Sequence, residues 1–228
     1  MPTPPNLLND DGTASIATAL MMSHHGFRRD AARFKIALRR VAAGDPSRVS
    51  TLRKEWEHYC NTLHGHHQAE DSGIFPSTKQ GHPELATVID GLTADHRKID
   101  PMLEEGTRLF AALPAQVDAA AEVVARLSAL LDTHLAIEET HIVPFLRAAK
   151  AFPPPTSAAE LEMYAQGFAW ACHGIAPDIV DQLFAMLPKE LLAKLPAARA
   201  AFAQRCEQAW GSSDAGSSRT PVPDWLSA

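Results

Sequence analysis

Hydrophobic residues recur at spacings of three and four along the first part of the chain, a pattern typical of amphipathic helices. Four long stretches carry it, at about 13–43, 48–75, 84–112 and 114–149, and no alternating strand pattern is evident. Pro101 is expected to kink or interrupt the third helix. Because short connections favour antiparallel neighbours, the pattern predicts an all-α protein with an up-down-up-down four-helix bundle.

The sequence after the fourth stretch indicates additional C-terminal helices. The segment FPPPTS at 152–157 is a stiff break. Three shorter helices are predicted after it, at 158–171, 176–187 and 188–209. The predicted organisation is a flexible arm at 1–12, the bundle at 13–150, a C-terminal helical extension at 151–210 and a disordered tail at 211–228.

Composition narrows the class of protein without identifying it. The chain has 228 residues, of which 46% are hydrophobic, and a net charge of -6. Without a basic patch, neither nucleic acid nor an anionic membrane is an expected partner. Three widely spaced cysteines form no CxxC motif, and we find no signal peptide and no apolar run of about 18 residues. These features predict a soluble, cytoplasmic protein.

A histidine interrupts the apolar stripe of each of the four long helices. The polar residues at or beside stripe positions are His24 in the first helix, His66, His67 and Glu70 in the second, His96 in the third, and His134, Glu138 and His141 in the fourth. A histidine and a glutamate four residues apart project onto one helix face, where both can reach a common metal ion. Periodicity alone does not choose between His66 and His67, which lie four and three residues before Glu70.

These interruptions are expected to meet inside the bundle. One histidine on an apolar face is usually a core residue with an ordinary hydrogen-bond partner. Here all four stripes are interrupted, at similar depths if neighbouring helices are antiparallel. Several buried histidines and two buried glutamates would be costly without a cation to hold them. The pattern therefore predicts a metal site rather than four unrelated core histidines.

The sequence resembles the hemerythrin-like, or HHE cation-binding, family over about residues 13–150. Four segments carry the resemblance, one in each helix: HHGFRRD at 24–30, HHQAEDSGIFP at 66–76, DHRKIDPML at 95–103 and HLAIEETHIVPFL at 134–146. The resemblance implies a non-haem centre of two iron ions within the bundle. The implied ligands are His24, His66, Glu70, His96, His134 and Glu138, with both glutamates bridging the irons.

The chain departs from oxygen-carrying hemerythrins on the third helix. The family places its second-helix ligand four residues before the glutamate, which favours His66 over His67. Oxygen carriers also place two histidines four residues apart on the third helix, whereas Asp100 stands at that spacing after His96. The remaining ligand would then be a carboxylate such as Asp100, a water molecule, or an extra histidine such as His67 or His141.

We consider three functions, two of which agree with the resemblance. The preferred one is a di-iron protein that binds dioxygen, peroxide or nitric oxide for sensing, storage or stress protection. The second is a di-iron enzyme, namely a peroxidase, nitric-oxide reductase or oxidase, and the third is a metal-free helical module. Imidazole and carboxylate ligands also suit zinc or manganese. The C-terminal extension is a candidate surface for a homodimer or an unknown protein partner.

Overall fold

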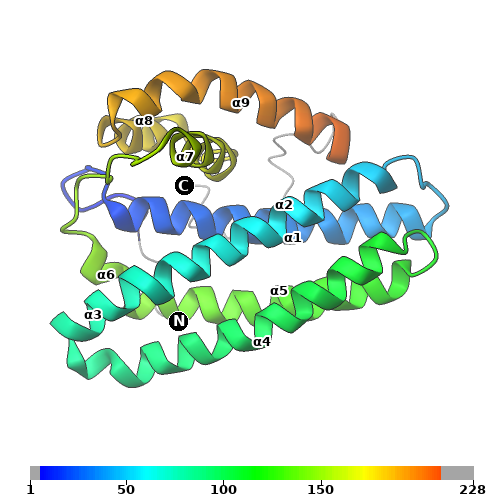
Figure 1. Cartoon of the computed structure of the whole chain (residues 1–228), viewed down its shortest axis with the longest axis horizontal. Coiled ribbons are helices and arrows are strands. Elements are labelled where there is room, and N and C mark those ends of the chain that lie inside the picture. The colour runs from blue at the N-terminus through cyan, green and yellow to red at the C-terminus, as the bar shows by residue number, and fades with distance from the viewer. Residues whose placement is uncertain (1–5, 212–228) are drawn as a thin grey trace. The chain divides into compact units, whose positions relative to one another are not determined.

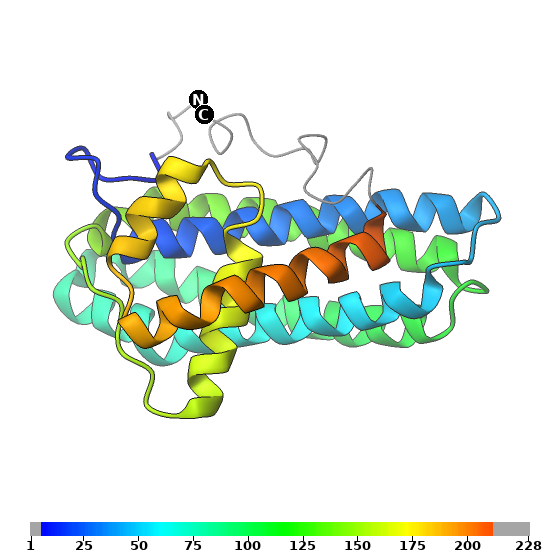
Figure 2. The ribbon, with the colours of Figure 1, turned by 90° about the horizontal axis from the view of Figure 1, so that it is seen from above.

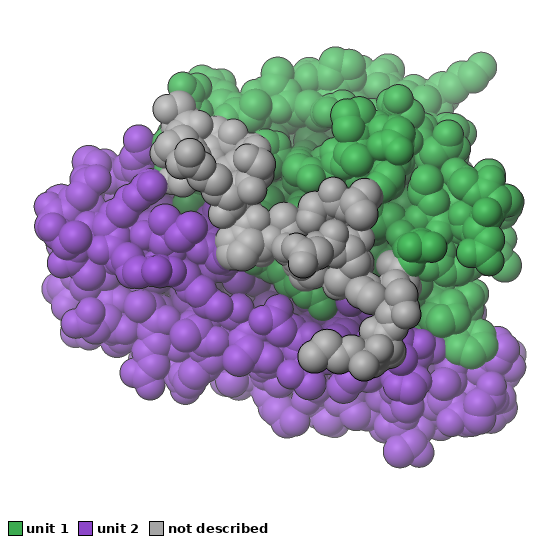
Figure 3. All heavy atoms as spheres, turned by 180° about the vertical axis from the view of Figure 1, so that it is seen from behind, with its two compact units in different colours: residues 1–29, 142–228 green, residues 30–141 purple. Residues whose placement is uncertain are grey.

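The computed structural model describes residues 6–211, and this range contains helices and turns but no strand. The predicted all-α fold, a helical bundle with additional C-terminal helices, is confirmed. The chain divides into two compact units, one formed by Met1–Arg29 and Ile142–Ala228 and the other by Asp30–His141 (Figure 3). We call them the first and second unit. The predicted tail beyond Gly211 and the start of the predicted arm, at 1–5, lie outside the described residues, and the predicted boundary at residue 150 stays a prediction.

The second unit contains the helices that the periodicity predicted. Its elements are residues 30–42 of α1 (Ile16–Ala42), α2 (Val49–Ala69), the π-helical segment η1 (Glu70–Ile74), α3 (Phe75–Gly81), the 3-10 turn η2 (Pro83–Leu85), α4 (Ala86–Ala111) and α5 (Val117–His141) (Figure 1). Helix α4 continues through Pro101, so this residue does not interrupt it. The helix predicted over 114–149 ends at His141, and a separate helix follows it. None of the helices between residues 6 and 211 combines the length and the apolar character that crossing a bilayer requires.

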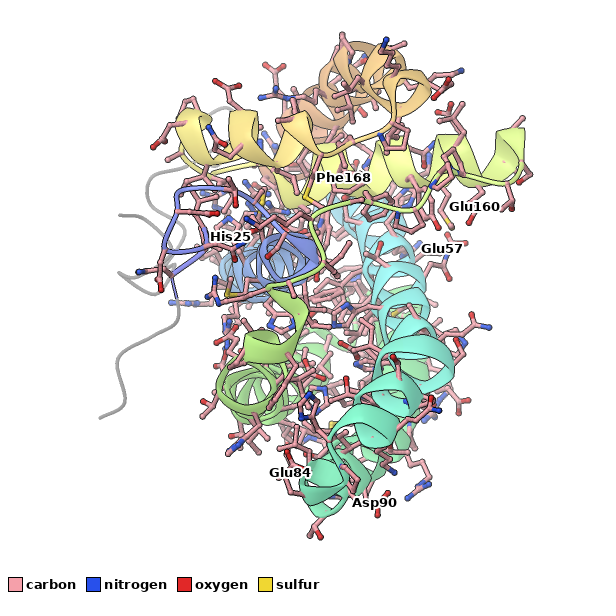
Figure 4. The ribbon with its side chains drawn as sticks, turned by 90° about the vertical axis from the view of Figure 1, so that its left-hand side faces the viewer. His25, Glu57, Glu84, Asp90, Glu160 and Phe168 are labelled. Carbon is pink, nitrogen blue, oxygen red and sulfur yellow. The ribbon has the colours of Figure 1, made fainter. Side chains whose placement is uncertain are left out.

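Neighbouring helices of the second unit run antiparallel. Arg53, near the start of α2, donates hydrogen bonds to the carbonyl oxygens of Phe110 (3.0 Å), in the last turn of α4, and of Leu113 (2.6 Å), just after that helix. At the other end of this pair, Lys79 of α3 forms an ion pair with Asp90 near the start of α4; Figure 4 labels Asp90. The order of contacts along α4 is therefore the reverse of that along α2 and α3.

An aromatic cluster fills one part of the second unit. The ring of Phe34 meets those of Trp56, Tyr59 and Phe110 edge-on, with centroid distances of 5.5, 5.7 and 5.3 Å. Trp56 stacks on Phe110 at 4.5 Å, and Gly106 leaves the space that the indole occupies. These rings join α1, α2 and α4. Edge-to-face and offset stacking are the arrangements that aromatic rings favour.

The first unit holds the additional helices. They are α6 (Val143–Leu146), α7 (Ala158–Ala171), α8 (Pro177–Ala185) and α9 (Lys189–Trp210), together with residues 16–29 of α1. Figure 2 shows α7 crossing α9. Ser157 caps α7 by accepting a hydrogen bond from the backbone N–H of Glu160 at 3.1 Å, which satisfies a donor that the first helical turn leaves without a partner.

Arg29 connects α1 to the turn after α7 within the first unit. Its guanidinium is buried and donates hydrogen bonds to the carbonyl oxygens of Trp170 (2.9 Å) and His173 (2.8 Å). His25, labelled in Figure 4, also lies against this turn, with Nε2 3.1 Å from the carbonyl oxygen of His173. A Cβ atom at Gly26 would lie 2.5 Å from the indole of Trp170, so glycine is needed there for the two segments to pack.

Candidate metal centre

The second unit brings five polar side chains of its predicted site to one place in its interior. Helix α2 contributes His66, η1 contributes Glu70, α4 contributes His96, and α5 contributes His134 and Glu138. The side chains of His134 and Glu138 are 0% exposed, and none of the five is more than 9% exposed. The spacing of four within His66–Glu70 and His134–Glu138 places each pair on one helix face, as the sequence indicated.

Three histidines and one glutamate form the first group of converging atoms. His67, Glu70, His96 and His134 each offer one nitrogen or carboxylate oxygen, and these atoms all lie within 4.8 Å of one another. The Nε2 atoms of His96 and His134 are 3.3 Å apart, and Nε2 of His96 is 3.5 Å from Oε2 of Glu70. Such an arrangement of three nitrogens and one oxygen is typical of a transition-metal site.

A second group shares Glu70 with the first. It includes His66, Glu70 and Glu138, whose offered atoms also lie within 4.8 Å of one another. Oε1 of Glu70 lies 3.0 Å from Nε2 of His66, whereas its Oε2 faces His96. Oε1 of Glu138 lies 3.4 Å from Nε2 of His134. Each glutamate therefore contacts a histidine of the first group, Glu70 through Oε2 and Glu138 through Oε1.

The π-helical segment Glu70–Ile74 lies within this site, and the sequence did not indicate it. A π-helical turn holds more residues than the 3.6 of an α-helix, and such turns occur frequently at functional sites. Here the segment begins at Glu70, so it changes the directions of Glu70 and Asp71 relative to the helix that precedes them. These two consecutive carboxylates contact opposite nitrogens of the His96 ring, since Oε2 of Glu70 faces Nε2 and Oδ2 of Asp71 faces Nδ1.

The carboxylate of Asp71 favours the form of His96 that carries its proton on Nδ1. Its Oδ2 accepts a hydrogen bond from Nδ1 of His96 at 3.0 Å, and its Oδ1 accepts one from the hydroxyl of Thr93 at 3.3 Å. With the proton held on Nδ1, the lone pair of Nε2 points toward Glu70 and His134. Ligand histidines in metalloproteins are commonly oriented by a carboxylate in this way. Asp95 is less well placed, since its Oδ2 lies 3.9 Å from Nδ1 of His134.

His67 is more central than the sequence resemblance implied. It is 4% exposed, and neither of its ring nitrogens makes a hydrogen bond. Its ring stacks on that of His96, with centroids 3.9 Å apart and planes 14° apart. Burial, reinforced by the nearby His96, lowers the pKa of His67 to about 2. Burial also lowers the pKa of His96, although its hydrogen bond to Asp71 opposes this shift.

Two other predicted residues lie outside the cluster, and a third belongs to the first unit. Asp100 and His141 are exposed and belong to neither group. Of the three side chains considered as a substitute for the missing third-helix ligand, Asp100 and His141 therefore do not reach the cluster. His24 lies on the part of α1 that belongs to the first unit, where it is 0% exposed. Its role as a ligand stays a prediction from the sequence.

The chemistry of the cluster fits a metal ion. Metal ligation requires neutral imidazole, and the lowered pKa values of His67 and His96 keep both rings neutral at ordinary pH. The two glutamates supply hard oxygen ligands and negative charge inside an apolar bundle. A cation at this position would offset the cost of burying these carboxylates. The donor set is compatible with iron, zinc or manganese.

One comparison with known proteins returns a match. The family model described as the hemerythrin HHE cation-binding domain matches residues 15–146, which is more than half of the chain. No curated protein and no solved structure matches the chain. The matched range includes α1, α2, α4 and α5, and with them every residue of the two groups described above. The chain belongs to the hemerythrin HHE cation-binding domain family.

Proposed function

We propose that this protein holds two non-haem iron ions and binds dioxygen, peroxide or nitric oxide for sensing, storage or stress protection. The observation that supports this best is the shared position of Glu70. Its two oxygens face histidines of two different groups, as expected of a carboxylate that bridges two ions. A site for one isolated ion would not require a second group around the same glutamate.

The proposed ligands follow from the two groups and from the family pattern. His67, His96 and His134 would hold one ion, and His66 and Glu138 would hold the other, with Glu70 between them. The family pattern adds His24 to this set. We propose that His67 replaces the second histidine that oxygen-carrying hemerythrins have on the third helix, because Asp100 at that position is exposed.

The protein side chains would control orientation, protonation and access. Iron, when bound, supplies the redox chemistry toward dioxygen, peroxide or nitric oxide. Asp71 keeps the proton of His96 on Nδ1, so that Nε2 is free to act as a ligand. Phe75 is 2% exposed and stacks on His96 with centroids 5.7 Å apart, which keeps water from that ring. The burial of the whole cluster favours very small ligands over organic substrates.

Metal content and an absorption spectrum test this proposal. The protein would be loaded with ferrous iron without oxygen, freed of loosely bound metal, and assayed for iron before and after exposure to air. We expect two irons per chain and an absorption band that responds to air. His134→Ala should lose iron, because His134 belongs to the cluster, whereas His64→Ala on the exposed face of α2 should retain it.

Two results would contradict the proposal. Clearly fewer than two irons per chain in the unmodified protein would contradict the di-iron centre. Equal iron content in the His134→Ala and His64→Ala proteins would show that iron binds elsewhere. Steady turnover of peroxide or nitric oxide by the loaded protein would instead favour the enzyme class over a binding protein.

A further inference from the structure

We infer that the two halves of the cluster differ in metal preference, so that the chain fills stepwise and can hold a pair of different metals. The inference rests on the proposed dinuclear site. The nitrogen-rich half, defined by His67, His96, His134 and the shared Glu70, binds the first ion. The carboxylate-rich half, defined by His66, Glu138 and the shared Glu70, binds the second ion more weakly and accepts manganese.

The two halves differ in their donor atoms. Among the residues of the second unit, the nitrogen-rich half offers three imidazoles and one carboxylate, and the carboxylate-rich half offers one imidazole and two carboxylates. If the family's His24 adds an imidazole to the second half, it still has fewer imidazoles than the first. Imidazole suits iron, cobalt and zinc better than manganese, whereas carboxylates suit manganese. Affinity increases in the order Mn²⁺, Fe²⁺, Co²⁺, and this increase should therefore be larger in the nitrogen-rich half.

The two halves also differ in how firmly their histidines are packed. In the nitrogen-rich half, His67 stacks on His96 at 3.9 Å, and the His96 and His134 rings meet at a centroid distance of 4.9 Å. The hydrogen bond from His96 to Asp71 fixes the middle ring of this set. In the carboxylate-rich half, the side chain of His66 is 9% exposed, compared with 5% for His96 and 0% for His134. Ligands that are already held in place lose less conformational entropy on binding, which favours the nitrogen-rich half for the first ion.

The charge of the cluster favours the first ion over the second. Glu70 and Glu138 are at most 1% exposed, and together they balance the charge of one divalent ion. A second divalent ion adds positive charge that these two carboxylates no longer balance, and uncompensated charge is costly in a buried site. Since Glu70 contacts both halves, the first ion also withdraws part of its charge from the second. The second affinity is therefore expected to be lower than the first.

Titration of the metal-free full-length protein with Co²⁺, followed by Mn²⁺, tests this without any measurement of activity. We expect a first Co²⁺ that binds at least about tenfold more tightly than the second, as typical effects of ligand environment on affinity suggest. With one equivalent of each metal, the Mn²⁺ electron paramagnetic resonance spectrum should be altered by a neighbouring Co²⁺. His67→Gln should weaken the binding of the first Co²⁺, and the matched His66→Gln should weaken the binding of the second.

The possible results separate this inference from the proposed function. Binding of less than one Co²⁺ per chain would contradict both. Two Co²⁺ ions with equal affinities, or an Mn²⁺ spectrum unaffected by bound Co²⁺, would contradict only the unequal halves. The reverse pattern, in which His67→Gln weakens the second step, would also overturn it. Circular dichroism of each variant confirms that the helices remain, and His67→Ala repeats the test if the glutamine variant unfolds.

Discussion

Replacement of Asp71 offers a direct test of how a residue beside the proposed ligand His96 would control metal binding. Asp71→Ala removes the acceptor for Nδ1–H of His96, which lies 3.0 Å away. The ring can then place its proton on either nitrogen, and the form protonated on Nε2 cannot bind metal through that atom, which is the one that faces Glu70 and His134. Loss of such a supporting carboxylate typically reduces metal affinity by about 10–100-fold. At about 1.4 kcal/mol for each factor of ten, this corresponds to about 1.4–2.8 kcal/mol.

The structure places the expected value near the lower end of this range. The side chain of Asp71 is 41% exposed, so solvent screens its charge and water can replace part of the lost hydrogen bond. We therefore expect the dissociation constant for the first Co²⁺ to rise by about tenfold in Asp71→Ala. Asp71→Asn keeps an oxygen acceptor without the charge and should recover part of the affinity.

Asp95→Ala is the matched control for this measurement. Asp95 also lies near a histidine of the cluster, but its Oδ2 is 3.9 Å from Nδ1 of His134, too far for a hydrogen bond. Its removal should change the Co²⁺ affinity much less. Competition with a chelator gives the affinities, and ¹⁵N NMR of the metal-free protein reports which nitrogen of His96 is protonated. An unchanged affinity and an unchanged tautomer in Asp71→Ala would refute the assigned role.

Two further predictions concern stability. Gly106→Ala would place a Cβ 2.1 Å from the buried indole of Trp56, so we expect the free energy of unfolding, measured with urea, to fall by about 1–3 kcal/mol. As a control, Gly91→Ala on the same helix meets no atom within 4 Å and should raise the free energy of unfolding by up to about 1 kcal/mol. Equal effects of the two changes would show that the predicted clash is relieved. His67 has a pKa lowered to about 2, so below its usual pKa of about 6.5 the unfolded chain binds a proton that the folded chain excludes. The metal-free protein should therefore lose up to about 1.4 kcal/mol per pH unit as the pH falls below about 6.5, and this dependence, measured from urea midpoints at several pH values, should be weaker in His67→Gln.

The sequence by itself was enough to predict the helices and most of the cluster. The spacing of apolar residues is a local property, because each turn of helix repeats after 3.6 residues whatever lies opposite it. His96 and His134 could therefore be placed on the buried stripes of α4 and α5, and both are buried there. The spacing of His134 and Glu138 likewise predicted that their side chains share a face, and their nearest atoms are 3.4 Å apart.

Only the tertiary structure decided where the side chains of His66 and His67 lie relative to the other cluster residues. Adjacent residues differ by about 100° around a helix, so periodicity leaves both at the edge of the stripe. The structure places both in the cluster, one in each group, because side chains from η1, α4 and α5 converge on both sides of this edge. The π-helical turn that begins at Glu70 was also invisible to a 3.6-residue pattern, since it departs from that period. The exposure of Asp100, the contact of Asp71 with His96 and the central place of His67 all depend on which side chains meet across helices, and residues far apart in the sequence determine that.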